Sequence, residues 1–221
     1  MSNNNNLGYA IQDFFEDVSD ALLGNERQAD LKQFADKHGF RFKKKYHNER
    51  LDIEIKAFDL FKGKKRKRVR NFLTRPDERI DGRISMFDFN KDTDFGKKVT
   101  TCVLIRSSYL RLPKFIIRPK KTTEKLTELF VHRDVGLSGY PFFNRTYAIQ
   151  TADVAPLEAF FTQKLVDLMV KTPHLWLEGN LDYLLLYDKN KPKSPDELLT
   201  FYDLGREIVD LMLYDNSDDF V

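Results

Sequence analysis

The spacing of hydrophobic residues changes along this chain, and each spacing indicates a different kind of element. Residues 7–23 carry apolar side chains at helical spacing, which predicts an amphipathic helix that ends at Gly24. A second helical pattern, over residues 29–38, ends at Gly39, a residue suited to the left-handed conformation that closes a helix. The segment GFRF that follows predicts a short strand, and Leu51 to Phe61 is an apolar patch that predicts a helical turn.

From Arg66 the pattern changes to alternating, β-branched and aromatic residues, which is typical of strands. Four strands are predicted, in RVRNFLTR, RIDGRISMFDFN, KKVTTCVLIRSS and PKFIIRPK. Clusters of Gly, Asp and Asn separate them, as expected for antiparallel neighbours joined by turns. The segment TTEKLTELFV then predicts a short helix, and PFFNRTYAIQT predicts another strand.

The C-terminal third returns to helical spacing. Apolar residues from Leu157 to Met169 predict one amphipathic helix, with Pro156 near its first turn. HLWLEGN and LDYLLLYD predict a hairpin that turns at Gly179-Asn180. Residues 194–197, Ser-Pro-Asp-Glu, form a capping box that opens a helix reaching about Tyr214.

This order of elements lacks the regular alternation of strand and helix that parallel sheets show. It favours an α+β fold: a mostly antiparallel sheet or open barrel covered by helices, with N-terminal helices and a C-terminal closing helix. We expect a single domain over residues 7–215, in which the helix at 7–24 is peripheral. A flexible tail, residues 1–6, precedes this domain, and an acidic tail, residues 216–221, follows it.

Composition supports a folded, soluble chain. The 221 residues are 41% hydrophobic, enough to form a core, and no apolar run reaches the length of a membrane span. The start, MSNNNN, lacks the features of a secretory signal. One cysteine, Cys102, allows no intramolecular disulfide, so a reducing cytoplasmic location is expected, with that thiol buried in a strand.

Charge is segregated although the net charge is only +3. Residues 41–75 hold 14 Lys or Arg and 4 Asp or Glu. The centre of this excess is a basic run: Lys62, Lys64, Lys65, Arg66, Lys67, Arg68 and Arg70. The run is interpreted as a patch for phosphates on nucleic acid or anionic lipid, or as a solvated loop leading into a strand. A third interpretation has it facing the acidic segment 196–221.

No catalytic, metal or cofactor motif is complete. Asp88, Asn90, Asp92 and Asp94 recur as in a calcium loop, but the required Gly and final Glu are missing. GLSGY at 136–140 has its second Gly one place too early for a nucleophile elbow. The four histidines are scattered, and no glycine-rich phosphate loop is present. We therefore predict no catalytic residue, no metal ligand and no cofactor.

Five motifs, in order, are FADKHGFRF, RVRNFL, GRISMFDFN, LPKFIIRP and FNRTYAIQT. Together they resemble a family of uncharacterised bacterial proteins, over about residues 28–215. The resemblance implies no activity, and it implies that the Arg-rich run is the entry to a shared strand. Relatives in that family often carry a membrane span ahead of the shared part, where this chain has its acidic amphipathic helix.

Three polar residues, Asp88, Asn144 and Arg145, lie within apolar segments of these motifs. We predict that they make structural hydrogen bonds that fix the sheet, with a ligand site as the alternative.

Three functions stay open at this point. The first is a non-catalytic module that binds another protein, favoured by the segregated charge, the acidic helix and the incomplete catalytic motifs. The second is polyanion binding through residues 62–70 together with Lys43 to Lys45. The third is an enzyme whose site is assembled across strands.

Overall fold

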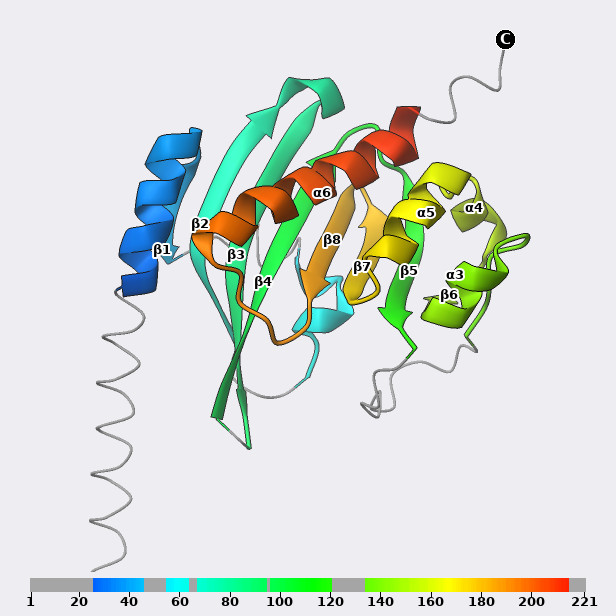
Figure 1. Ribbon diagram of the computed structural model, residues 1–221, viewed down its shortest axis with the longest axis horizontal. Helices are drawn as coiled ribbons and strands as arrows, with labels where there is room; N and C mark the ends of the chain where they lie inside the picture. Colours follow the sequence, from blue (N-terminus) through cyan, green and yellow to red (C-terminus); the bar gives the residue numbers. More distant parts are fainter. Residues whose placement is uncertain (1–25, 46–54, 64–66, 95, 121–133, 215–221) are drawn as a thin grey trace, which may run out of the picture.

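A computed structural model describes residues 26–45, 55–63, 67–94, 96–120 and 134–214 (Figure 1). Several predicted segments lie outside these residues: the tail 1–6, the helix 7–24, the helix in TTEKLTELFV and the acidic tail 216–221.

The described chain begins with a helix over residues 26–38 and continues through strands, short helical turns and helices. The strands are β1 (Arg41–Lys45), β2 (Lys67–Asp77), β3 (Gly82–Thr93), β4 (Gly96–Ser107), β5 (Leu112–Pro119), β6 (Tyr147–Thr151), β7 (Leu175–Leu181) and β8 (Tyr183–Asp188). The 3-10 turns are η1 (Asp59–Phe61) and η2 (Glu78–Ile80). The later helices are α3 (Pro141–Thr146), α4 (Ala155–Glu158), α5 (Gln163–Lys171) and α6 (Pro195–Tyr214).

The eight strands of the described residues form one sheet in the order β1-β2-β3-β4-β8-β7-β5-β6. Every neighbouring pair is antiparallel. The order has two ends, at β1 and β6, so the sheet is open rather than closed into a barrel. The predicted α+β class, with an antiparallel sheet and a C-terminal helix, is confirmed.

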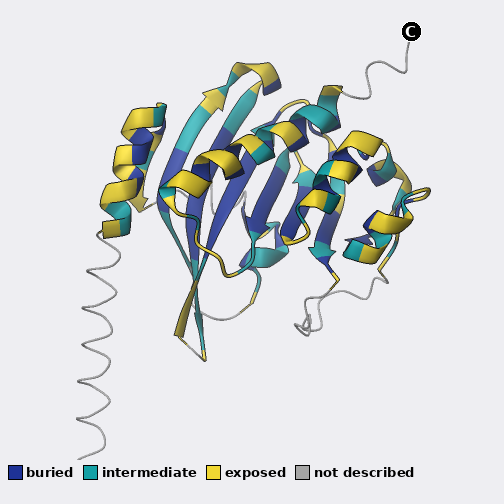
Figure 2. Cartoon of the chain, viewed as in Figure 1, coloured by how far each residue is buried: buried dark blue, intermediate teal, exposed yellow. Residues whose placement is uncertain are grey.

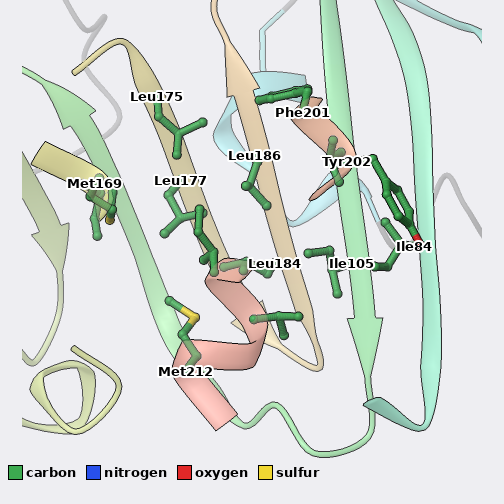
Figure 3. Close-up of a cluster of buried hydrophobic side chains, with 14 of the residues drawn as sticks. Ile84, Ile105, Met169, Leu175, Leu177, Leu184, Leu186, Phe201, Tyr202 and Met212 are labelled. Atoms are coloured by element: carbon green, nitrogen blue, oxygen red, sulfur yellow. The ribbon is translucent and has the colours of Figure 1, made fainter. Parts of the chain in front are cut away.

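One face of the sheet, the helical face, packs against α6 and α5 (Figure 1). Ile84, Ile105 and Leu186 from three strands meet Tyr202 and Met212 of α6 in a continuous core (Figure 3). Helix α6 has buried residues along the side that meets the sheet and exposed residues along the other (Figure 2). Burying this apolar stripe is what fixes the helix on the sheet.

The opposite face of the sheet is rich in aromatic residues, and we call it the aromatic face. Its cluster includes Phe87 and Phe89 of β3, together with Trp176 of β7. Phe87 and Phe89 are two positions apart in β3, and alternate residues of a strand point to the same face, so both lie on this face. Phe58, just before η1, and Phe61, its last residue, pack on this face and bring residues 55–63 across it. Cys102 is buried in the same cluster, which confirms its predicted environment.

Both predicted helix ends beside the sheet are confirmed. Gly39 closes the first described helix with a φ of 71°, the left-handed conformation. At α6, the Ser194 N–H donates to Glu197 Oε2 at 2.8 Å, and the Glu197 N–H donates to Ser194 Oγ at 3.4 Å. This reciprocal pair is the predicted capping box.

Part of one predicted strand is wrong, because residues 141–146 form helix α3 and the strand begins at Tyr147. Pro141 stands in the first turn, where its fixed φ favours a helix. Asn144 stabilises this conformation because its side chain accepts from the Leu137 N–H at 2.9 Å and donates to the Leu137 carbonyl at 2.8 Å.

The single helix predicted from Leu157 to Met169 is also wrong, because the chain forms two helices there, α4 and α5. Thr162 begins the second helix, with its hydroxyl oxygen accepting from the Leu165 N–H at 3.3 Å. A hydroxyl that caps an N–H group in this way favours a new helix start over continuation.

The β7–β8 hairpin turns at Leu181 and Asp182, not at Gly179-Asn180 as predicted, because Gly179 pairs with Leu184 inside the ladder. Gly179 lies beneath the ring of Phe115 on β5: a Cβ placed there would be 2.1 Å from the Phe115 Cε1 atom. The glycine therefore serves a close approach between strands rather than a turn.

This approach predicts that Gly179→Ala lowers the free energy of unfolding by about 2 kcal/mol, the usual range for inserting a methyl group into a packed core. The Phe115 ring is buried and must move to admit the new atom. Urea unfolding would measure the loss, and Phe115→Leu in the Gly179→Ala background should recover part of it. A Gly179→Ala chain as stable as the parent would contradict the proposed close approach.

Candidate functional site

The structure describes part of the basic run. Lys64, Lys65 and Arg66 lie outside the described residues, and Lys67 is described by its backbone alone. Lys62 pairs with the Asp59 carboxylate at the end of η1. Arg68 and Arg70 lie in β2, so the run does lead into a strand, as one of the interpretations holds.

The sheet places further cations on the strands near this run. Strand β1 places Lys45 opposite Arg70, and the β3–β4 ladder places Lys91 opposite Lys98. Like charges directly opposite one another destabilise a sheet. Helix α6 lies on the helical face, where its Asp210 pairs with Arg79 at 3.3 Å. Within the described part of the acidic segment 196–221, Asp210 is thus paired with Arg79 and not with the basic run.

Asp88 lies at the centre of a polar network in the middle of β3. Its carboxylate accepts from Arg27 Nε and Nη2, both at 2.8 Å, from Asn71 Nδ2 at 2.9 Å and from Thr101 Oγ1 at 2.9 Å. Arg27 also donates to the Lys193 carbonyl at 2.8 Å. The network therefore joins the first described helix, three strands and the segment before α6.

The other two polar residues singled out from the sequence lie on α3 rather than in a strand. Asn144 holds the loop at Leu137, as described above. Arg145 is exposed, with its guanidinium 5.4 Å from the centroid of the Phe142 ring. Asp88 therefore shares no site with Asn144 and Arg145, because it lies among β2, β3 and β4 whereas the other two lie on α3.

Glu178 is a buried carboxyl group on the aromatic face that sequence reasoning missed. It accepts from the Asp59 N–H at 2.5 Å, the Leu60 N–H at 3.1 Å and the Tyr187 hydroxyl at 2.7 Å. Burial raises its pKa to about 7, against the lowering effect of these hydrogen bonds. Because two of the donors belong to η1, Glu178 fastens residues 59–60 to the sheet.

The raised pKa of Glu178 predicts a pH-dependent stability. The folded chain holds this proton more tightly than the unfolded chain, so the stabilising contribution is complete below about pH 4.5 and is lost as pH rises to about 7. The loss should amount to about 3 kcal/mol relative to Glu178→Gln, which cannot ionise. Urea unfolding of both chains from pH 4 to 8 measures it. Parallel stability curves for the two chains would contradict the prediction.

Three large exposed side chains gather at one end of the sheet, and we call them the exposed cluster. Tyr109 in the β4–β5 loop is 55% exposed, Leu181 in the β7–β8 turn is 66% exposed and Tyr214 at the end of α6 is 45% exposed. Two more exposed hydrophobic residues, Phe142 and Leu199, lie elsewhere, on α3 and early in α6. A group of exposed apolar and aromatic side chains is typical of an interaction surface.

Backbone and hydroxyl contacts tie the segments of the exposed cluster together. The Tyr214 hydroxyl donates to the Arg79 carbonyl in η2. At the end of β4, the Ser107 hydroxyl donates to the Ile80 carbonyl at 2.5 Å and the Ser107 N–H donates to the Asp182 carbonyl at 3.0 Å. The C-terminal end of α6 and the β4–β5 loop lie at the same end of the sheet in Figure 1.

Leu181 has a backbone conformation that its side chain disfavours. Its φ is 52°, the left-handed region that Gly, Asn and Asp tolerate far better than a branched apolar residue. Strain of this kind is concentrated at functional sites. A leucine that is both strained and exposed at a turn contributes little to the core.

The surface beside the exposed cluster is acidic. A hollow of about 520 Å³ runs along α6 to Tyr214 and is lined by Asp203, Glu207 and Asp210 together with Arg206. The Arg206 guanidinium lies 3.7 Å from Asp203 Oδ1 and 3.7 Å from Asp77 Oδ2. When Arg79, which pairs with Asp210, is counted beside Arg206, the three carboxylates still outnumber the two cations, so this strip of α6 is negatively charged.

Sequence reasoning missed the exposed cluster because its members come from three distant segments. One local signal was available at Leu181: an apolar residue stands between Asn180 and Asp182, two residues typical of turns. No such signal marks Tyr109 or Tyr214, whose exposure depends on the tertiary structure.

Within the described residues, no group of three or more His, Cys, Asp or Glu is placed to hold a metal ion. Among the helices of that same part of the chain, none combines the length and the apolar character needed to cross a membrane.

A scan against protein-family models and a search of curated proteins match nothing, so the resemblance to a bacterial family stays a prediction. Among solved structures, the crystal structure of the mycobacterial trehalose monomycolate transport factor A, TtfA, matches with a TM-score of 0.54. The two chains are 11% identical, and the match covers 84% of this chain and 96% of that chain. This chain is therefore similar in fold to that transport factor.

Proposed function

We propose that this protein is a non-catalytic module that binds another protein through the exposed cluster of Tyr109, Leu181 and Tyr214. The observation that carries the proposal is Leu181, which is 66% exposed and has a φ of 52°. Asn or Gly at this position would stabilise the turn, because both tolerate a positive φ better than Leu does. Binding explains why an exposed leucine stands there instead.

The partner's surface follows from the chemistry around the exposed cluster. Apolar and aromatic side chains need an apolar pocket, while the carboxylates of Asp203, Glu207 and Asp210 favour cations at its rim. We therefore expect a protein partner with an apolar depression bordered by Lys or Arg.

The similar structure is that of a transport factor, and its name indicates no catalytic reaction, which agrees with a non-catalytic module. Likeness of fold does not carry function by itself, so the exposed cluster, and not this likeness, supports the binding role proposed here. The buried Cys102 thiol is consistent with the reducing cytoplasm expected from the sequence.

Affinity capture from a lysate tests the proposal. The intact chain is compared with a Tyr109→Ser, Leu181→Ser chain and with Lys171→Ser, an exposed change on α5. A protein retained by the intact and Lys171→Ser chains, and lost from the double variant, is the expected result. Equal retention by all three chains would exclude the exposed cluster as the binding surface.

A second candidate function, polyanion binding, has one specific observation in its favour. The sheet holds Lys45 opposite Arg70 and Lys91 opposite Lys98, although like charges opposed in this way cost stability. Nucleic-acid staining of the same eluates tests it. Nucleic acid that is lost at moderate salt and on changing these residues to Gln would favour this candidate over the first.

A further inference from the structure

Residues 55–63 lie across the aromatic face of the sheet, and we call them the strap. In Figure 1 the helical turn of the strap, η1, is drawn in cyan beside β7 and β8. Phe61 of the strap packs edge-on against Phe89, with ring centroids 4.7 Å apart, and its centroid lies 6.2 Å from that of Phe87. Both of these β3 rings are buried. The strap thus covers aromatic side chains that the sheet would otherwise present to water.

Glu178 is a polar tie between the strap and the sheet. Its carboxylate, on β7, accepts from the N–H groups of Asp59 and Leu60, as described above. Two further N–H groups of the strap donate to carbonyl groups three residues earlier within the strap itself. Those local bonds can persist when the strap moves away from the sheet, whereas the two bonds to Glu178 cannot.

The described groups that face Glu178 leave its charge poorly balanced. From the strap, Asp59 brings a second carboxylate with both oxygens buried, and its cation is Lys62. From β8 comes the Tyr187 hydroxyl, and from β4 the Cys102 thiol, and burial raises the pKa of each so that both stay neutral. The residues paired with Glu178 on β5 and β8 are apolar. An ionised Glu178 is therefore a buried charge beside a like charge, which is costly.

We infer that the strap opens from the aromatic face when Glu178 ionises, so that rising pH uncovers Phe87 and Phe89. Opening returns the carboxylate to water and separates it from Asp59. Because burial raises the pKa of Glu178 from 4.5 to about 7, opening becomes more favourable as pH rises through this range. The strap contains no residue of the exposed cluster, so this device is independent of the proposed protein partner.

Amide hydrogen exchange, followed by NMR on the full chain, tests the inference. The N–H groups of Asp59 and Leu60 report on the strap, and those of the β4–β8 ladder report on the whole fold. Exchange is measured from pH 4 to 8 and at several low urea concentrations. Glu178→Gln cannot ionise, and Glu78→Gln, an exposed change in η2, is the matched control. Tyr187→Phe is a second variant, which removes a hydroxyl that favours the ionised form of Glu178.

We expect the protection of Asp59 and Leu60, corrected for intrinsic exchange, to fall about 100-fold from pH 4 to 8. It should lie well below the protection of the ladder at each pH and respond less to urea, because a local opening exposes little surface. Glu178→Gln should abolish the pH dependence, and Glu78→Gln should keep it. Tyr187→Phe should move its midpoint upward by roughly one pH unit, the effect of one lost hydrogen bond.

Two results would overturn the inference. If the amides of the strap share both the protection and the urea dependence of the ladder, the strap does not open separately from the whole fold. If the pH dependence persists in Glu178→Gln, or if its midpoint is unchanged in Tyr187→Phe, Glu178 is not the group that releases the strap.

Discussion

The Asp88→Ala variant is expected to unfold with a free energy about 3 kcal/mol below that of the parent chain, at the lower end of the range for breaking a buried ion pair. Asp88 is 3% exposed, and its loss leaves Arg27, Asn71 and Thr101 without their shared acceptor. The lower end applies because the Arg27 side chain is 26% exposed and keeps some access to water. Urea unfolding monitored by circular dichroism measures the change.

Asp92→Ala is the matched control, because Asp92 lies on the same strand at an incompletely buried position opposite Lys97. It should cost less than about 1 kcal/mol. Changing Arg27 to Met in the Asp88→Ala background should recover part of the loss, since the unpaired charge is then removed. Equal losses for the two single variants would show that the network around Asp88 does not hold the fold.

Leu181→Asn is expected to weaken partner binding at least 30-fold while leaving the chain as stable as the parent or more stable. Asn tolerates a φ of 52° better than Leu, so the turn should gain up to about 1 kcal/mol. The loss of an exposed apolar contact at the centre of an interface corresponds to about 2 kcal/mol of binding free energy. Calorimetry with the captured partner and thermal unfolding measure the two effects.

Because binding should weaken while stability is kept or increased, this prediction is specific to function. A residue kept for folding would lose stability and binding together, whereas Leu181 should lose binding and keep stability. Lys171→Asn, exposed on α5, serves as the control for a general surface effect and should change neither quantity. Unchanged affinity in Leu181→Asn would remove this leucine from the interface.

Elements with a strong local signal could be predicted from the sequence. The alternation around Phe87 and Phe89 predicts β3, and the capping box at Ser194 and Glu197 predicts the start of α6. Elements whose conformation depends on tertiary contacts could not be predicted from the sequence. Nothing near Gly179 in the sequence shows that the Phe115 ring, from a different strand, fills the space where a Cβ would be.

The same distinction applies to the candidate sites. The basic run is continuous in the sequence and is visible there, while the exposed cluster is assembled from distant segments. Glu178 had one local signal, a carboxyl group between apolar residues in LWLEGN. Its contact with η1, which lies more than a hundred residues earlier in the chain, becomes visible in the folded structure alone.

The central claim, that the exposed cluster binds a protein, is tested most directly by photo-crosslinking in cells from a benzoylphenylalanine placed at position 109. The account predicts one discrete protein adduct, which disappears when Leu181→Asn is added and persists when Lys171→Asn is added instead. The same label placed at position 171 should give no such adduct. An adduct from position 109 that survives Leu181→Asn, or an equal adduct from position 171, would contradict the assignment of the interaction to this end of the sheet.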